Sequence, residues 1–351
     1  MKKIIFQTND MSIAGGVERV VSMWCNYFSK NLDDDYEIVL LTGSKEKSFY
    51  ELENNVKKEF CNYKPKYRVF PIGRIYSWYK YLKNLNDDDV IIINKYCVVN
   101  SIYLLRKIGL FKNIKIIYFA HGGVSDLYTF YSKYRRNKIL YTFDNIICLH
   151  NDMPEADLCE KIKILPNPCT FKTDKKCDYN SKNILCVGRL SHEKGVDLLI
   201  KSWSKTDRKD FKLIIVGDGL EKENLIELCR RLNLEDSVVF EGNKSNVEEY
   251  YLKSSIYAMT SRIEGLPMVL LEAMECSMPI IAYSNAGTKN LVEDIGIIID
   301  NFNEDEYSKK LSELISDVSL REYLGKKSKI KSFNYDIDVV ALKIKKIIGI
   351  G

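Results

Sequence analysis

Short apolar runs of strand length recur along this sequence, and amphipathic helical segments lie between most of them. Several runs, such as 91–93, are apolar without alternation, which is typical of strands buried on both faces of a parallel sheet between two layers of helices. The sequence therefore predicts an α/β protein with two doubly wound, Rossmann-like domains. We expect strands at 4–6, 38–41, 90–93, 114–119, 145–149 and 162–165, then at 184–187, 213–216, 238–240, 256–259, 280–283 and 297–299, with helices at 17–29, 307–318, 320–331 and 339–348.

The length of 351 residues suits two domains of roughly 150 to 200 residues each. The strand pattern breaks at Pro166-Asn167-Pro168, and the polar, turn-forming stretch 172–182 follows. We therefore expect an N-terminal domain over residues 1–170 and a C-terminal domain over residues 171–333.

Positive charge is concentrated in the first half of the chain. Residues 1–168 contain 25 Lys and Arg against 19 Asp and Glu, whereas the remainder contains 28 against 29. This excess indicates an anionic partner, either a phosphate-bearing substrate or an acidic membrane surface. Nucleic acid is not expected as a partner, because the excess is small and no nucleic-acid motif accompanies it.

The sequence also bears on the cellular compartment. It has no run of about 20 uncharged apolar residues that could span a bilayer, and no apolar signal region follows Met1-Lys2-Lys3. The ten cysteines form no CxxC pair, which is typical of reduced thiols. We expect a cytoplasmic protein, and peripheral association with the inner face of the cell membrane stays open.

Two cations lie in a turn between an expected strand and a helix of the second domain. Gly188-Arg189-Leu190 follows the strand at 184–187, and Glu193-Lys194-Gly195 precedes the next helical pattern. At the carboxyl edge of an open α/β sheet, such cations and a helix N-terminus would bind a diphosphate and stabilise it as a leaving group. The alternative is a solvated loop with two ordinary surface cations.

A second strand-to-helix turn contains Gly217-Asp218-Gly219, where glycine permits either a tight turn or a close approach of the backbone to a ligand. The third glycine of the G-x-G-x-x-G fingerprint is missing, so an NAD-dependent dehydrogenase is disfavoured.

The most informative stretch is 261–274, which directly follows a buried strand. Glu264 lies in the turn, and Glu272 lies inside a helix that should begin near Pro267. Two carboxylates in these places could bind two hydroxyl-bearing parts of one ligand, such as a sugar and a ribose. The alternative makes Glu264 a partner of the helix dipole and Glu272 a solvated residue, although the neighbours of Glu272 are apolar.

This E-x7-E pair, in the setting EGLPMVLLEAM, resembles the donor-site motif of glycosyltransferase family 4. The members of this family are retaining enzymes of group 1 type with the two-domain GT-B fold. The other matching motifs follow in the family's order: Gly15-Gly16-Val17-Glu18-Arg19, His121-Gly122-Gly123, Pro166-Asn167-Pro168, Gly188-Arg189-Leu190 with Glu193-Lys194-Gly195, and Gly217-Asp218-Gly219. The resemblance implies two Rossmann-like domains that face each other across a cleft. It also implies that a C-terminal helix at about 334–351 packs back on the first domain.

The resemblance also implies roles for individual residues. The implied catalytic residues are Glu264, His121, Arg189 and Lys194. The implied donor-binding residues are Gly15, Gly16, Gly188, Arg189, Lys194, Gly217, Glu264, Gly265, Leu266 and Glu272. Glu264 would contact the sugar, Glu272 the ribose and the two cations the diphosphate, with His121 beside the transferred sugar. The chain departs from the family at Ser277, where glycine is frequent, and at Asn290, where an acidic residue is frequent.

Neither a metal nor another cofactor is expected. Asp33-Asp34-Asp35 and Asp87-Asp88-Asp89 each precede an expected strand, at the edge of the sheet opposite to a ligand site, so solvated turns explain them better than a metal-binding D-x-D. No grouping of His, Cys and Asp is typical of zinc.

Two stretches at 67–83 and 128–136 combine aromatic and basic residues. Three uses stay open: a peripheral membrane surface, an amphipathic helix with its rings in the core, and stacking of rings on an acceptor sugar.

Together these features predict a glycosyltransferase that moves a hexose-type sugar from a nucleoside-diphosphate sugar, with UDP favoured. The acceptor would be a hydroxyl of a glycan or of a polyprenyl-diphosphate-linked glycan in cell-surface polysaccharide synthesis, bound by the first domain. The alternatives are a nucleotide-sugar epimerase or hydrolase, or a non-catalytic nucleotide-sugar-binding protein of the same fold.

Overall fold

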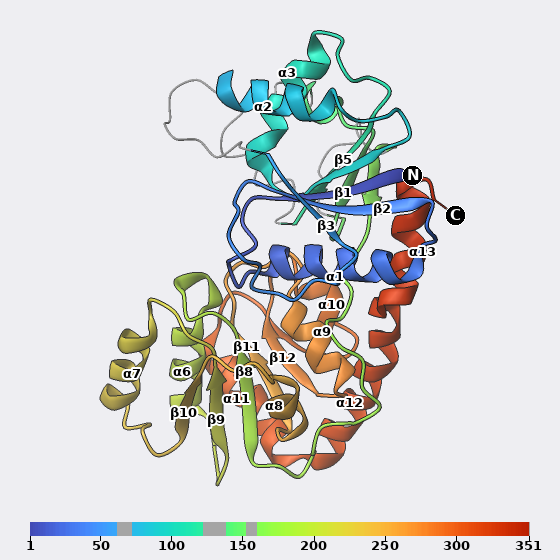
Figure 1. Cartoon of the computed structure of the whole chain (residues 1–351). Helices are drawn as coiled ribbons and strands as arrows, with labels where there is room; N and C mark the ends of the chain where they lie inside the picture. The colour runs from blue at the N-terminus through green and yellow to red at the C-terminus, as the bar shows by residue number, and fades with distance from the viewer. Residues whose placement is uncertain (62–71, 122–137, 152–159, 351) are drawn as a thin grey trace. The chain divides into compact units, whose positions relative to one another are not determined.

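The computed structural model describes residues 1–61, 72–121, 138–151 and 160–350 (Figure 1). The chain forms two compact units. Unit 1 contains Met1–Asn167 and Ala341–Gly351, and unit 2 contains Pro168–Val340. The basic and aromatic stretch at 128–136 and the glycines of His121-Gly122-Gly123 lie outside the described residues.

Unit 1 is built on a seven-stranded sheet in the order β3-β2-β1-β4-β5-β6-β7, and each recorded strand pair is parallel. The strands are β1 (Lys2–Thr8), β2 (Tyr36–Thr42), β3 (Lys57–Phe60), β4 (Val90–Ile93), β5 (Lys115–Ala120), β6 (Asn145–Cys148) and β7 (Ile162–Ile164). All four residues of β4 are buried, as expected for a strand covered on both faces.

Helices cover both faces of this sheet. The helical elements are α1 (Gly16–Asn31), α2 (Ile72–Leu82), the short 3-10 helix η1 (Tyr96–Val98) and α3 (Val99–Lys107). The apolar stripe of α1 lies on one face, where the Phe28 ring stacks on Phe6 with centroids 5.9 Å apart. Trp78 of α2 packs with Ile5 on the other face, which Figure 1 shows covered by α2 and α3.

Unit 2 contains a six-stranded parallel sheet in the order β10-β9-β8-β11-β12-β13. Its strands are β8 (Asn183–Val187), β9 (Lys212–Val216), β10 (Val238–Gly242), β11 (Ile256–Met259), β12 (Ile280–Tyr283) and β13 (Gly296–Ile299). The strand numbers rise outward from β8 to β10 on one side of the sheet and from β11 to β13 on the other. The chain therefore reverses its winding direction between β8 and β11.

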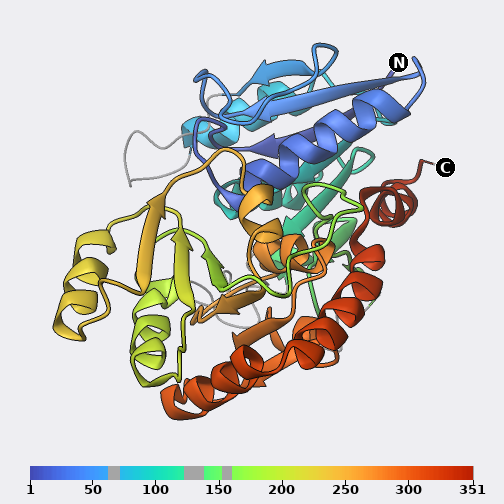
Figure 2. The ribbon, with the colours of Figure 1, turned by 90° about the horizontal axis from the view of Figure 1, so that it is seen from below.

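Helices also lie on both faces of the second sheet. The helical elements of unit 2 are η3 (His192–Lys194), α6 (Val196–Lys205), α7 (Lys222–Arg231), α8 (Glu248–Leu252), α9 (Met268–Glu275), α10 (Lys289–Val292), α11 (Glu304–Ser316), α12 (Val318–Ser332) and η4 (Phe333–Tyr335). The last helix, α13 (Ile337–Ile348), begins in unit 2 and belongs to unit 1 from Ala341 onward. Apolar residues of α6, α7 and α11 form one core cluster, and those of α8, α9 and α10 form another. Figure 2 shows α6 and α7 side by side near the strands that they cover.

The predicted α/β class with two doubly wound domains is confirmed. The strand β3 was missed, because Lys57-Lys58-Glu59-Phe60 is a polar edge strand without the apolar run that marks the others. The interpretation of Asp87-Asp88-Asp89 as a solvated turn was wrong for Asp89. Its carboxylate is buried and accepts hydrogen bonds from the backbone N–H groups of Lys3 and Asn86.

Candidate functional site

The reversal of strand order between β8 and β11 marks a ligand position in unit 2. At such a point the loops that leave the carboxyl ends of adjacent strands run to opposite faces of the sheet and leave a crevice. The loop after β8 contains Arg189 and Lys194, and the loop after β11 contains Glu264. The fold thus brings three of the predicted site residues to the same edge of the sheet.

The side chains of Lys194 and Glu264 meet directly. The Lys194 Nζ donates a hydrogen bond to Glu264 Oε1 at 2.6 Å, and only 9% of the Glu264 side chain is exposed, against 33% for Lys194. A carboxylate this far buried needs a charged or hydrogen-bonding partner, which Lys194 supplies. We call this arrangement the Lys194–Glu264 pair.

A set of contacts behind the pair fixes the two loops to each other. The Arg262 guanidinium binds both carboxylate oxygens of Asp197 at 2.8 Å, and it also donates to the His192 carbonyl at 2.7 Å. The Arg262 backbone N–H donates to the Glu193 carbonyl at 2.8 Å. This bidentate ion pair and its backbone contacts hold the Glu264 loop against the Lys194 loop.

Gly195 permits this close approach. Its φ is +62°, and a methyl group on its α-carbon would lie 2.1 Å from the carbonyl oxygen of Thr260. The Thr260 hydroxyl donates to the Gly195 carbonyl at 2.8 Å. Only glycine can adopt this backbone conformation and leave room for the neighbouring strand end.

The loops containing Gly188 and Gly217 also touch. Gly217 has a φ of +142°, and a methyl group there would lie 1.9 Å from the Gly188 carbonyl oxygen. Gly188 differs, because a methyl group on it would meet no atom within 4 Å. Arg189 follows Gly188 and is exposed. The close packing of the two loops thus explains why residue 217 is a glycine, whereas the α-carbon of Gly188 faces open space.

Gly265 and Leu266 lie in the bend that leads into α9, and Pro267 caps that helix. A methyl group on Gly287, in the loop after β12, would lie 2.3 Å from the Gly265 carbonyl oxygen. The Asn285 side chain also donates to the Ser261 carbonyl at 2.9 Å. The bend containing Gly265 is therefore supported from its far side by the loop after β12.

Glu272 is buried within α9, with 1% of its surface exposed. Its Oε1 accepts a hydrogen bond from the Thr170 hydroxyl, and its Oε2 accepts one from the Tyr251 hydroxyl, both at 2.7 Å. The alternative of a solvated Glu272 was wrong, because α9 packs this face against the core. Contact of Glu272 with a ribose stays a prediction.

Unit 1 has its own reversal of strand order, between β1 and β4. Gly15 and Gly16 lie at the start of α1 after β1, and a methyl group on Gly15 would lie 2.2 Å from Glu18 Oε2. The buried Glu18 carboxylate pairs with Lys95 Nζ at 2.7 Å, just after β4. Lys95 was not among the site residues predicted from the sequence, although its place at the carboxyl end of a buried strand was a usable signal.

His121 follows β5 and is half-buried. Its Nε2 lies 2.7 Å from Asn94 Oδ1, and its ring stacks on Phe119 with centroids 4.1 Å apart. Burial, and to a smaller extent the positive charge of Lys95, lower the pKa of His121 to about 3. The imidazole is therefore neutral at physiological pH. Asn94 was likewise not predicted from the sequence.

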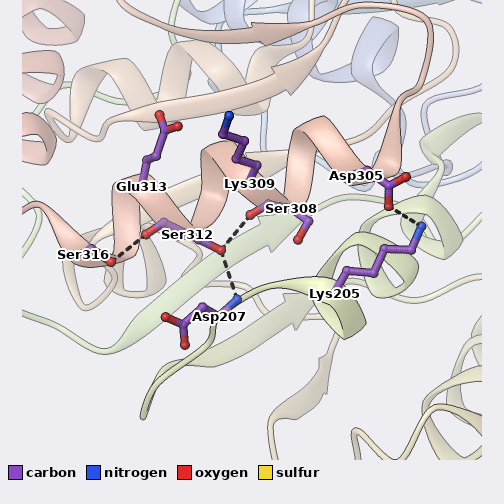
Figure 3. Close-up of a pocket in the computed structure, with 8 residues that line it drawn as sticks. All are labelled: Lys205, Asp207, Asp305, Ser308, Lys309, Ser312, Glu313 and Ser316. Atoms are coloured by element: carbon purple, nitrogen blue, oxygen red, sulfur yellow. Dashed lines mark hydrogen bonds and ion pairs between the residues drawn. The ribbon is translucent and has the colours of Figure 1, made fainter.

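A hollow of about 600 Å³ lies elsewhere on unit 2, along α6 and α11 (Figure 3). Its lining side chains largely bond to one another or to the backbone, as in the ion pair of Lys205 with Asp305 at 2.8 Å and the hydrogen bond from the Ser312 hydroxyl to the Ser308 carbonyl. None of the predicted site residues lines it.

Two further findings apply to the described part of the chain. Within it, no group of three or more His, Cys, Asp or Glu side chains could hold a metal ion. None of its helices has the length and apolar character needed to cross a bilayer.

Comparison with known proteins identifies the family. The family described as "Glycosyl transferases group 1" matches residues 171–331. An uncharacterized glycosyltransferase of Haemophilus influenzae is 31% identical over 370 residues, which cover 99% of this chain and all of the relative. The chain belongs to the group 1 glycosyltransferases.

Other relatives and a solved structure agree with this assignment. The amylovoran biosynthesis glycosyltransferase AmsD of Erwinia amylovora is 26% identical, over 99% of this chain and 100% of its own. An α-1,4-N-acetyl-D-galactosaminyltransferase of Campylobacter jejuni, named for a PP-undecaprenol-linked glycan, is 26% identical over 99% of each chain. The Anabaena protein Alr3699/HepE, solved with UDP and glucose, aligns with a TM-score of 0.78 at 18% identity over 99% of this chain and 100% of its own, which shows the GT-B fold.

Replacing Gly195 with alanine tests the contact between the two loops of unit 2. Because the methyl group would overlap the Thr260 carbonyl and the φ is positive, we expect the free energy of unfolding to fall by about 2 to 4 kcal/mol. Gly188→Ala is the matched control and should leave stability unchanged, since its methyl group points into open space. Urea unfolding followed by circular dichroism measures both, and equal stability of the two variants would contradict this account.

The low pKa of His121 predicts a specific pH dependence of stability. His121 takes up a proton near pH 6.5 in the unfolded chain but only at about pH 3 in the folded chain. The contribution of neutral His121 to the free energy of unfolding is therefore complete above pH 6.5 and is lost as the pH falls below that value. Between pH 7 and pH 5, the wild type should lose about 2 kcal/mol more unfolding free energy than His121→Gln. Fluorescence in a Trp203→Phe background reports unit 1, because its two tryptophans are Trp24 and Trp78. If the free energies of unfolding of the two proteins changed equally between pH 7 and pH 5, the low pKa of His121 would be refuted.

Proposed function

We propose that this glycosyltransferase transfers a hexose-type sugar from a UDP-sugar to a hydroxyl of a glycan or polyprenyl-diphosphate-linked acceptor in cell-surface polysaccharide synthesis. The observation that carries the proposal is the Lys194–Glu264 pair at the reversal point of a doubly wound sheet, with Arg189 exposed on the same loop. UDP bound to the Anabaena neighbour supports the choice of nucleotide. The names of the Erwinia and Campylobacter relatives support the class of acceptor.

The cations of unit 2 suit the departure of a diphosphate. Negative charge develops on the leaving diphosphate as the bond to the sugar breaks, and cations fixed in advance stabilise that charge. Lys194 is held in place by its ion pair with Glu264, while Arg189 lies exposed on the preceding turn. We propose that these two side chains bind the diphosphate and that the reaction needs no metal ion.

The two carboxylates suit hydroxyl-bearing groups. Glu264 Oε1 already accepts from Lys194, and a carboxylate has about four acceptor positions in all, so a sugar hydroxyl can be bound without breaking the ion pair. Glu272 is buried, and a ribose hydroxyl would have to share or replace the hydrogen bond from Thr170. Retention of the anomeric configuration is proposed from the family resemblance.

Incubation with a panel of UDP-, GDP- and ADP-sugars, with and without membrane lipid extract, tests the proposal. We expect nucleotide release that requires the extract, persists in EDTA and gives a product with the donor's anomeric configuration. Arg189→Ala or Lys194→Met should weaken donor use tenfold or more, since each removes a charge-assisted contact of about 1.5 to 3 kcal/mol. Glu264→Gln should reduce transfer by a similar factor. Lys326→Met, on the exposed side of α12, is the matched control and should have no effect.

Three outcomes would overturn the proposal. Release of nucleotide without any acceptor would favour a hydrolase. Interconversion of donor sugars would favour an epimerase. Binding of donor without consumption would favour a non-catalytic binding protein.

We also propose that α2 and α3 of unit 1 face an anionic membrane. Their exposed apolar side chains include Ile72, Tyr76 and Leu104, with Ile108 just beyond α3. Residues 72–86 and 94–115 contain no acidic residue but contain Arg74, Lys80, Lys83, Lys95, Arg106, Lys107, Lys112 and Lys115. Lys95 is paired with Glu18 and Arg106 with Asp144, so the other cations of this list are the ones available to lipid. Exposed apolar side chains and such cations suit the headgroup region of an anionic bilayer, where a lipid-linked acceptor would lie. Trp78 and Leu82 of α2 are in the core, so only the exposed face of that helix serves this purpose.

Vesicle flotation tests this surface. The protein should float with vesicles that contain anionic lipid and not with neutral ones, and salt should weaken the binding. The double variant Ile72→Ser with Tyr76→Ser should bind several-fold less. Leu220→Ser, which changes an exposed leucine of unit 2, should bind as the wild type does. Equal binding to neutral vesicles, or no effect of the double variant, would contradict the proposal.

A further inference from the structure

Residues from three elements meet at the carboxyl edge of the sheet in unit 1. Asn94 and Lys95 follow β4 directly, and His121 follows β5, which pairs with β4 in parallel register. Glu18 reaches the same place from α1. These four polar residues therefore lie around the reversal point between β1 and β4.

The hydrogen bond between Asn94 and His121 fixes which ring nitrogen carries the proton. The Asn94 Nδ2 donates to the Ile92 carbonyl at 3.3 Å, so the oxygen of the same amide faces the ring. An amide oxygen can only accept a hydrogen bond, and His121 Nε2 must therefore donate to it. In a neutral imidazole the other nitrogen, Nδ1, then has a lone pair and no proton.

The surroundings of the ring keep it neutral and in one orientation. The Phe119 ring stacks on it at 20° between planes, which restricts its rotation. Lys95 places a positive charge nearby and lowers the pKa of His121, in addition to the effect of burial. Lys95 is itself held by Glu18, whose side chain is 6% exposed.

The remaining nitrogen is shielded and lacks a partner. His121 Nδ1 is buried and has no hydrogen-bond partner among the described residues. A buried acceptor without a donor is unfavourable, and ligand sites commonly contain such atoms before the ligand binds.

We infer that Asn94 is a positioning residue that holds His121 in the Nε2-protonated form, so that Nδ1 accepts a hydrogen bond from a substrate hydroxyl. Lys95 supports this state, because a second proton on the ring would abolish the acceptor. The inference rests on the proposed function in one respect only, which is that the hydroxyl belongs to a sugar.

Nuclear magnetic resonance of protein labelled with 15N-histidine tests the tautomer in the full chain. The chain has three histidines, so His150→Gln and His192→Gln assign the signals. We expect a protonated Nε2 and an unprotonated Nδ1 for His121 at neutral pH. Asn94→Leu should give a mixture of tautomers, and Asn94→Asp should restore the single form because its carboxylate also accepts from Nε2. Lys95→Met should raise the pH at which the ring takes up a second proton, whereas Lys57→Met, in an exposed ion pair of β3, should not.

Protonation of Nδ1 in the wild type would overturn the inference, and so would an unchanged tautomer in Asn94→Leu. Transfer activity separates the inference from the function on which it rests. If no nucleotide sugar is consumed while the tautomer is as expected, the proposed function fails and the role of Asn94 stands. If transfer occurs with Nδ1 protonated, the function stands and the inference fails. If both hold, activity should fall in Asn94→Leu and recover in Asn94→Asp.

Discussion

The site in unit 2 depends on the contact between the loops after β8 and β11. A carboxylate with 9% exposure is held 2.6 Å from an ammonium group because Gly195 lets the two backbones approach and Arg262 ties them together. Lys194 and Glu264 thus sit next to each other with opposite charges before any ligand arrives. Such pre-organisation avoids the cost of bringing the charges together during a reaction.

The same geometric rule operates in each unit. A parallel sheet that reverses its order opens its carboxyl edge at one place, and polar residues follow the strands there. In unit 2 the residues are two cations and a carboxylate, which suit an activated sugar phosphate. In unit 1 they are Asn94, Lys95 and His121 with Glu18, which suit a neutral group that bears hydroxyls. The chemistry of the two edges differs although the folds are alike.

Much of this could be predicted from the sequence, and the reasons for the exceptions are physical. Strands such as β4 and β11 are apolar on both faces, so their runs stand out, whereas the polar edge strand β3 has no such signal. Lys194 and Glu264 were found because each follows a strand in a recognisable motif. The partnership of Arg262 with Asp197, 65 positions apart, was not predictable, because no local pattern encodes a tertiary ion pair. For the same reason Asn94 was missed and Asp89 was wrongly interpreted as part of a solvated turn, since their partners come from distant segments.

A crystal structure of the protein soaked with a UDP-sugar tests the central claim most directly. The account predicts diphosphate oxygens within about 3 Å of Lys194 Nζ, with a sugar hydroxyl on Glu264 and the loops after β8 and β11 otherwise unchanged. Nucleotide bound in the hollow along α6 and α11, or a diphosphate that touches neither Lys194 nor Arg189, would contradict it.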